Sequence, residues 1–155
     1  MICIDFETMP IAGNPIVTAP KPVGVAIKYD DEPSDYYTGD QMATELYSAF
    51  DSGEPLLMHN AVFDLSVATQ HFDIEWPAWD RVHDTMYLVF LNDPHTRSLS
   101  LKAAGESLLD RKPEEQDALK EWILENVPQA TRRSWGAWMY KAPHELLAPY
   151  ACQDT

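Results

Sequence analysis

The stretch MICIDFET, residues 1–8, decides the fold, because an apolar run passes there into two carboxylates that stand one residue apart. Side chains alternate between faces along an extended strand, so Asp5 and Glu7 point the same way. Phe6 and the two isoleucines share the opposite face, which can pack against a core. Like charges this close raise each other's pKa. We therefore expect a strand with one core face, one acidic face and a cation between the acids.

The composition bounds the class of protein. The chain has 155 residues, of which 45% are hydrophobic and 6 are glycine, and this indicates one globular domain. No apolar run approaches the ~18 residues of a membrane span, and no signal-peptide pattern stands at the N-terminus, so a cytoplasmic protein is expected. Cys3 and Cys152 suit a reducing compartment as packed side chains.

The charge balance is strongly acidic. The chain has 25 aspartates and glutamates and 11 lysines and arginines, which gives a net charge of -14. A basic surface is needed for broad, non-specific binding of nucleic acid, so this class is excluded. Any nucleic acid would be held locally by metal ions, backbone amides and stacking, or by a basic neighbour outside this chain.

Strand and helix patterns alternate along the first part of the chain. An antiparallel meander of three strands is expected at residues 1–8, 23–29 and 35–38. Apolar residues at helical spacing follow from Met42 to Phe50, and the apolar run at 56–58 is typical of a buried parallel strand. These patterns predict an α/β fold whose central mixed sheet, an antiparallel meander plus a parallel strand, is flanked by helices.

The rest of the chain reads mainly as helices. One is expected from Ala61 to Phe72, with Asp64 in its first turn, where the helix dipole favours an anion. Residues 76–82 look irregular. Further helices are expected at 85–92 with Asp84 as its cap, at 100–109, from Pro113 to about Val127, and as two short helices within 142–155, the second opening at Pro149. The aromatic segment 129–142, with Trp135, Trp138 and Tyr140, fits core packing best, and a lid or a nucleic-acid surface less well.

Four acids and a tyrosine form a pattern that spans this order of elements. Asp5 and Glu7 lie on a strand, Asp64 at a helix start, and Asp154 one helical turn after Tyr150. The motifs are DFET at 5–8, NAVFD at 60–64 and YACQD at 150–154. In this order they resemble the DEDD superfamily of 3′–5′ exonucleases, a branch of the ribonuclease H-like fold that includes the proofreading domains of DNA polymerases.

The third motif indicates the tyrosine subgroup. The histidine subgroup has its base five residues before the last Asp, where this chain has Pro149, whereas Tyr150 stands four before it. With WGAW at 135–138 ahead of this motif, the chain most resembles the N-terminal exonuclease of a phage-type family A DNA polymerase. Such polymerases continue far beyond this point. We therefore expect residues 1–155 to be a single, monomeric exonuclease domain trimmed from a longer polymerase.

The acids suit the hydrolysis of a phosphodiester. Two divalent ions ~4 Å apart stabilise charge on both the attacking and the leaving oxygen. Carboxylates favour Mg²⁺ or Mn²⁺, and no Cys/His cluster offers a zinc site. By the resemblance, Asp5 would bridge both ions, Glu7 and Asp154 would complete the nucleophile-side site, and Asp64 would hold the second ion, partly through water. Tyr150, with an ordinary pKa of ~10, would orient the attacking water as a protonated phenol.

Substrate contacts follow from the same resemblance. The backbone around Phe6 and Thr8 and the side chains of Met9, Asn60 and Phe63 would grip the 3′ end of single-stranded DNA, where aromatic and apolar groups stack on bases without reading sequence. Phe63 fits a core position equally well, and Met9 a loop position.

The main expectation is therefore removal of nucleoside monophosphates from the 3′ end of single-stranded or frayed DNA, in proofreading. A ribonuclease D-like exoribonuclease would use the same four acids and is the first alternative. A non-enzymatic interaction module is disfavoured because all four acids and Tyr150 are present, and a ribonuclease H-type endonuclease because the tyrosine motif would have no role. His59, His83 and His144 are expected to be structural rather than catalytic, and no site role is assigned to them.

Overall fold

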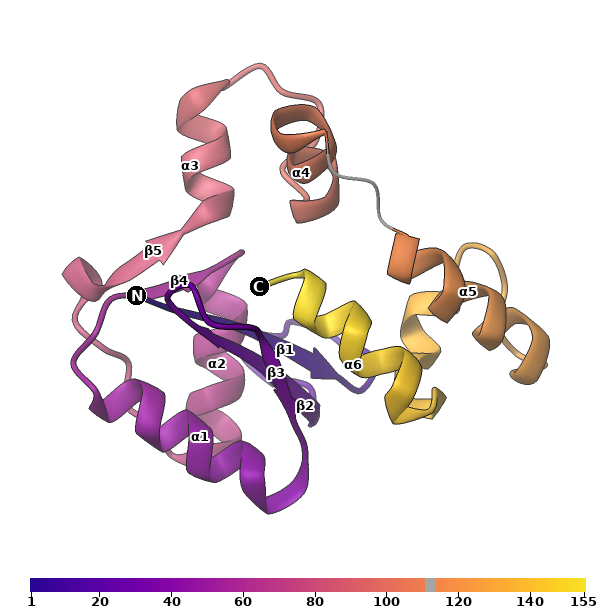
Figure 1. The fold of residues 1–155 in the computed structure, drawn as a ribbon, viewed down its shortest axis with the longest axis horizontal. Coiled ribbons are helices and arrows are strands. Elements are labelled where there is room, and N and C mark those ends of the chain that lie inside the picture. Colours follow the sequence, from indigo (N-terminus) through magenta and orange to yellow (C-terminus); the bar gives the residue numbers. More distant parts are fainter. Residues whose placement is uncertain (111–113) are drawn as a thin grey trace.

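The computed structural model describes residues 1–110 and 114–155 as a five-stranded sheet with helices on both faces (Figure 1). The strands are β1 (Ile2–Thr8), β2 (Pro22–Tyr29), β3 (Asp35–Tyr37), β4 (Leu56–Met58) and β5 (Val82–Asp84), in the spatial order β3-β2-β1-β4-β5. The α-helices are α1 (Gly39–Asp51), α2 (Ala61–Phe72), α3 (Thr85–Asn92), α4 (Leu101–Leu109), α5 (Glu114–Asn126) and α6 (His144–Gln153). Two 3₁₀ helices, η1 (Trp79–Arg81) and η2 (Trp135–Lys141), complete the described structure.

The pairing of the strands confirms the predicted mixed sheet. β1 pairs antiparallel with β2, and β2 antiparallel with β3, so the first three strands form the expected meander. β4 runs parallel to β1 on its other side, and β5 continues the parallel part. The predicted α/β class is correct, and the acidic strand β1 lies at the centre of the sheet.

One face of the sheet packs against α1 and α2, and the apolar residues between them form the first core. The α1 stripe from Met42 to Phe50 is buried there, as its helical spacing predicted, together with Ile2, Ile4 and Phe6 of β1. Complete burial of an apolar side chain of this size stabilises the fold by about 1.5–3 kcal/mol. Strand β1 is therefore anchored through its apolar face, and its other face is free to carry charge.

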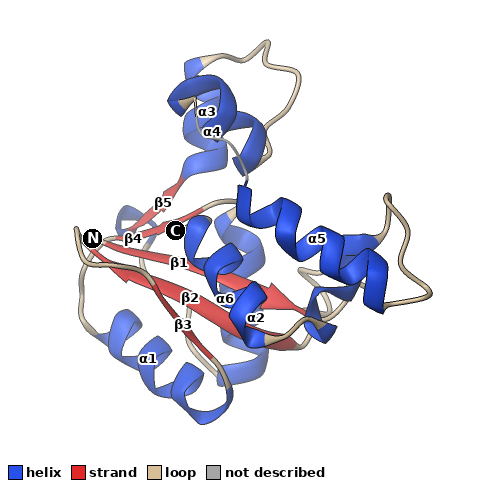
Figure 2. Cartoon of the chain, turned by 45° about the vertical axis from the view of Figure 1, so that its right-hand side comes forward, coloured by secondary structure: helices blue, strands red, loops and turns tan. Residues whose placement is uncertain are grey.

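The second face is covered by α5, η2 and α6, which share a second, smaller apolar cluster (Figure 2). Its buried residues are Leu119, Ile123, Val127, Leu147 and Tyr150. Trp135 and Trp138 pack against this cluster, and Trp135 meets the Tyr150 ring edge-on at 6.4 Å between ring centroids. Trp135 and Trp138 are thus partly buried against this cluster, which agrees in part with the core packing favoured from the sequence, and Trp135 supports Tyr150.

The prediction of two short helices near the C-terminus is wrong. Helix α6 runs unbroken through Pro149. Proline cannot donate to the carbonyl four residues earlier, which here belongs to Glu145. Both residues are exposed, so water can satisfy that carbonyl, while Leu147 and Tyr150 hold the opposite side of the helix against the sheet. Tertiary packing therefore outweighs the local break.

The segment expected to be irregular, residues 76–82, contains η1 and leads into β5, which the sequence did not predict. Three residues with a single valine carry no visible alternation, and only pairing with β4 makes them a strand. Beyond this edge α3 and α4 project from the sheet (Figure 1). Pro113, the expected start of the next helix, lies outside the described residues. Within these residues no helix combines the length and the apolar character needed to cross a membrane.

Candidate active site

Asp5 and Glu7 lie side by side on the face of β1 that points away from the first core. Asp5 stands opposite Ala26 of β2, and Glu7 stands opposite Gly24. Neither partner has a side chain that reaches over the acids, although the ring of Tyr36 covers Gly24. Glu7 is nevertheless only 6% exposed, because the helices of the second face cover it. The alternation read from the sequence is correct, and the two acids share the covered face of β1.

Asp64 joins this pair from the first turn of α2. Its carboxylate oxygen accepts a hydrogen bond from the backbone N–H of Phe6 at 3.1 Å, so the helix start is tied to the middle of β1. The residue is 2% exposed. An acid this deeply buried needs such a donor, because a bare carboxylate in an apolar environment is costly.

Asp84 fixes the start of the helix that carries Asp64. One of its oxygens accepts from the N–H of Asn60 and the other from the N–H of Ala61, both at 2.9 Å. The first oxygen also accepts from Met86 at 2.9 Å, so Asp84 caps α3 as predicted from the sequence. Asn60 itself has left-handed backbone angles (φ 65°) and does not cap α2 with its side chain. A carboxylate from β5 therefore replaces the missing cap.

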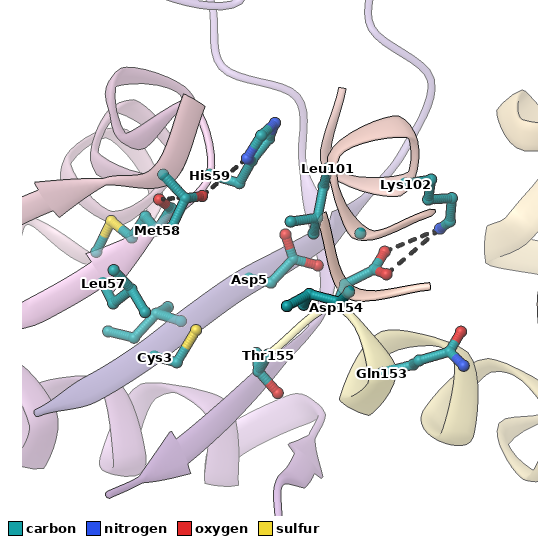
Figure 3. Close-up of a pocket in the computed structure, with 14 residues that line it drawn as sticks. Cys3, Asp5, Leu57, Met58, His59, Leu101, Lys102, Gln153, Asp154 and Thr155 are labelled. Carbon is teal, nitrogen blue, oxygen red and sulfur yellow. Dashed lines mark hydrogen bonds and ion pairs between the residues drawn. The ribbon is translucent and has the colours of Figure 1, made fainter. Parts of the chain in front are cut away.

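Asp154 and Tyr150 enter the site from the end of α6, where both contact Lys102 of α4. The Lys102 ammonium donates to the Tyr150 hydroxyl at 2.8 Å and to the nearer Asp154 oxygen at 3.0 Å. It also lies 4.0 Å from the centre of the Tyr150 ring. Figure 3 shows the Asp154 carboxylate between Lys102 and Asp5. The cation expected between Asp5 and Glu7 stays a prediction: Lys102 pairs with Asp154, and its charge lowers the pKa of Asp5 and of Glu7 without a direct contact to either being recorded.

The electrostatics of the four acids show that they converge. Burial, then the charge of Asp154, raises the pKa of Asp5 to about 7, against the pull of Lys102. The pKa of Glu7 is well above its usual value through burial and the charges of Asp5 and Asp154. Burial and the charge of Asp5 likewise raise the pKa of Asp64. Asp5 is thus the acid that is coupled to each of the others.

The Tyr150 hydroxyl is held as a neutral phenol. Burial raises its pKa above the ordinary value, and the charges of Glu7, Asp154 and Asp5 add to the effect. Its oxygen accepts a hydrogen bond from Lys102, so its own proton remains available to an acceptor in the site. The group can therefore orient a water molecule but is a poor proton acceptor.

The acids suit hard divalent cations in residue type and in charge. Carboxylate oxygens are the ligands that Mg²⁺ and Mn²⁺ prefer, and a divalent ion would offset the repulsion that raises these pKa values. Among the described residues, however, no group of three or more His, Cys, Asp or Glu side chains stands in a finished metal-binding arrangement. Asp154 is instead paired with Lys102. Metal binding in this site would therefore require Asp154 to exchange the ammonium for the ion.

The predicted substrate contacts fall into two groups. Phe6 packs into the first core, Phe63 is partly buried against it, and the Phe6 N–H is already used by Asp64. Thr8 and Met9 are partly exposed at the end of β1, where the Met9 N–H donates to the carbonyl of Lys21. Asn60 is exposed. The side chains at the end of β1 and at the start of α2 are thus better placed for a ligand than the two phenylalanines.

A pocket opens on the other side of Asp5 and Asp154 (Figure 3). Apolar side chains of β4 and α4, including Leu57 and Leu101, line it. His59 lies at its edge, where its ring nitrogens contact the Thr85 hydroxyl and the Leu99 carbonyl, both at 2.8 Å. Both nitrogens are occupied, which fits the structural role expected from the sequence.

Of three comparisons with known proteins, one finds similar proteins. No family model matches the sequence, and no curated protein does. Solved structures are similar in fold. One, described as the apo form of a nuclease, has a TM-score of 0.64 at 19% identity over 99% of this chain. Another, Brucella melitensis NrnC with bound Mg²⁺, has a TM-score of 0.63 at 18% identity over 99% of this chain.

The chain has the ribonuclease H-like nuclease fold. It spans 65% of the length of each of these two proteins, so their activities are not carried over with the fold. The fold does explain why residues far apart in sequence meet at β1. Helix α2 follows the parallel strand β4 on one face of the sheet, helix α6 covers the other face, and both bring their motifs to the central strand.

Lys102 and Asp84 are the site residues whose roles the sequence did not reveal. A lysine in the first turn of a helix is usually solvated, and nothing local connects Lys102 with Tyr150, 48 positions away. The one available signal was the need for a cation beside two adjacent carboxylates. Asp84 was read as a helix cap, but its bonds to Asn60 and Ala61 depend on the pairing of β5 with β4.

Proposed function

We propose that this chain is a 3′–5′ exonuclease that hydrolyses the terminal phosphodiester of a single-stranded nucleic acid with Mg²⁺ or Mn²⁺ and releases nucleoside monophosphates. The observation that carries the proposal is the convergence of four acids beside the neutral phenol of Tyr150. The charge of Asp5 acts on Glu7 and Asp64, the charge of Asp154 acts on Asp5 and Glu7, and Lys102 joins Asp154 to Tyr150. The nuclease fold and the Mg²⁺ bound in one similar structure support the same reading.

The pattern of coupling suggests how the acids divide two metal sites. Asp5 is coupled to all three other acids and suits a ligand shared by both ions. Glu7 and Asp154 are coupled to each other as well, which groups them on one side, while Asp64 is coupled to Asp5 from the other. When bound, a pair of divalent ions would stabilise charge on the attacking and leaving oxygens.

The remaining residues would position the reactants. Tyr150 would donate a hydrogen bond to the attacking water, keep its own proton and hold the water in line with the phosphorus atom, because its oxygen is fixed by Lys102. Lys102, once released from Asp154, is a cation within reach of the phosphate. Thr8, Met9 and Asn60 would contact the terminal nucleotide from the ends of β1 and α2.

Two kinds of substrate are compatible with this site. A ribonuclease D-like activity on RNA has the better support, since both similar structures carry the names of nucleases and neither is described as a polymerase. Proofreading of DNA, as part of a longer polymerase, rests on the motif resemblance and on the tyrosine spacing. The 2′-hydroxyl of the terminal nucleotide decides between them.

The test is digestion of 5′-labelled single-stranded DNA and RNA of the same sequence, with Mg²⁺ and separately with Mn²⁺. We expect a ladder of products shortened from the 3′ end, with the preferred strand degraded faster. The matched controls are EDTA and Asp5→Ala, both of which should abolish the ladder. A ladder that persists in Asp5→Ala, or products of internal cleavage of the strand, would refute the proposed reaction.

A further inference from the structure

The hydroxyl of Tyr36 is a buried donor that the fold leaves without a partner. Among the described residues, it is the one buried side-chain polar atom that has no hydrogen-bond partner. A buried hydroxyl without a partner costs about 1–3 kcal/mol relative to a satisfied one. Such a group calls for an explanation, and a ligand-dependent partner is one.

Tyr36 lies on the acidic face of the sheet. It stands opposite Ala26 of β2, and Ala26 stands opposite Asp5 of β1, so a single cross-strand row carries Tyr36 and Asp5 on the same side. The neighbouring row holds Gly24 opposite Glu7. Tyr36 therefore belongs to the same surface as the two acids, reached from the third strand.

The ring of Tyr36 leans over Gly24 toward Glu7. A Cβ atom built on Gly24 would come within 2.2 Å of the Tyr36 hydroxyl oxygen, so the hydroxyl occupies the place of the missing side chain. Cβ atoms of directly opposite residues lie about 4.5–5.5 Å apart. The hydroxyl therefore lies near the position opposite the Glu7 Cβ, within the length of the Glu7 side chain, so a rotation of that side chain can bring its carboxylate into hydrogen-bond contact.

A purely structural role explains the ring but not its oxygen. An aromatic ring that covers a strand glycine fills a gap in the sheet surface, and Tyr36 also packs against the second apolar cluster. Phenylalanine would serve this purpose without an unpaired hydroxyl. Burial and the charges of Glu7 and Asp5 raise the pKa of Tyr36, so its hydroxyl stays a donor at neutral pH.

We infer that Tyr36 is a positioning residue whose hydroxyl donates to the Glu7 carboxylate when Glu7 binds a divalent cation, and that Gly24 is required to admit it. The inference rests on the proposed metal-dependent function and extends it to the support of one ligand. Hydrogen bonds to metal-binding carboxylates orient them, and loss of such a bond typically weakens metal binding about 10- to 100-fold.

The test is calorimetric titration of Mn²⁺ into the wild type, Tyr36→Phe and Tyr37→Phe. Tyr37 is the adjacent residue of β3 and packs on the opposite face, against the first core, so it is a matched control. We expect Tyr36→Phe to weaken Mn²⁺ binding about tenfold or more and Tyr37→Phe to leave it unchanged. In EDTA, Tyr36→Phe should unfold at the wild-type temperature or above, because it loses an unpaired hydroxyl.

Each other outcome is decisive. Mn²⁺ affinity within twofold of wild type in Tyr36→Phe would overturn the inference and leave the proposed function intact. A variant that unfolds at a lower temperature in EDTA would show that the hydroxyl serves the fold instead, and would also overturn it. Failure of the wild type to bind Mn²⁺ would overturn the proposed function, and the inference with it.

Discussion

Replacement of Asp5 by asparagine is expected to stabilise the metal-free protein while abolishing its activity. Burial and the charge of Asp154 raise the pKa of Asp5 from 3.8 to about 7. Between these two values the folded state binds a proton that the unfolded state has released. This contribution to stability is complete at low pH and is lost as the pH rises to about 7. At pH 8 the ionised Asp5 therefore opposes folding.

The size of the effect follows from the shift. One pKa unit corresponds to about 1.4 kcal/mol, so the three-unit rise sets an upper limit of about 4 kcal/mol. Asp5 is partly exposed, and water screens its charge, so we expect Asp5→Asn to gain about 1–2 kcal/mol at pH 8. For a chain of this length that is a rise of about 2–8 °C in melting temperature.

The assay is thermal unfolding followed by circular dichroism in EDTA, at pH 8 and at pH 5. The gain should shrink by more than half at pH 5, where the folded wild type keeps Asp5 protonated. Asp31→Asn, the same chemical change at an exposed acid, is the control and should shift the melting temperature little at either pH. If Asp5→Asn lowers the melting temperature at pH 8, or raises it equally at both pH values, the electrostatic reasoning about the site is wrong.

Three further predictions concern the groups around the acids. Tyr150→Phe should slow strand shortening at saturating Mn²⁺ about a hundredfold without abolishing it, because the phenol orients water but is not the base; a rate equal to that of Asp5→Ala would contradict this. Lys102→Met should move the rising limb of the pH–activity profile to higher pH, because Lys102 lowers the pKa of Asp5 and of Glu7; an unchanged profile would argue against it. Asp84→Ala leaves three backbone N–H groups without their acceptor and should lower the free energy of unfolding in urea by about 1–3 kcal/mol; the exposed Asp80→Ala is the control.

The parts of the fold that follow from local pattern could be predicted from the sequence. The alternation in residues 1–8 is correct because one face of β1 is fully packed while the other is not. Helix α2 has the predicted bounds because its apolar residues and the strand before it define both ends. The position of Asp64 follows, since the first turn of a helix after a parallel strand lies at the edge where the neighbouring strand ends.

The parts that depend on contacts between distant segments could not be predicted. Strand β5 exists through its pairing with β4, and helix α6 continues through Pro149 because its far side is packed on the sheet. Lys102 reaches Tyr150 from a helix that carries no signature of the site. In each case the structure is stabilised by a contact with a segment far away in the sequence, and a local sequence pattern does not reveal such a contact.

The elements that carry the acids are packed more extensively than the helix that carries Lys102, and this difference bears on how the site could accept a metal. Asp5 and Glu7 stand on a central strand whose other face is fully buried, and Asp64 on a helix with six buried residues. Lys102 stands on α4, where Ala104 is the one buried residue among those of the helix. Asp5, Glu7 and Asp64 therefore keep their places, while Lys102 can release Asp154 at little cost in packing. A site arranged in this way can exchange an ammonium for a divalent ion without rebuilding the sheet, as the proposed metal-dependent hydrolysis requires.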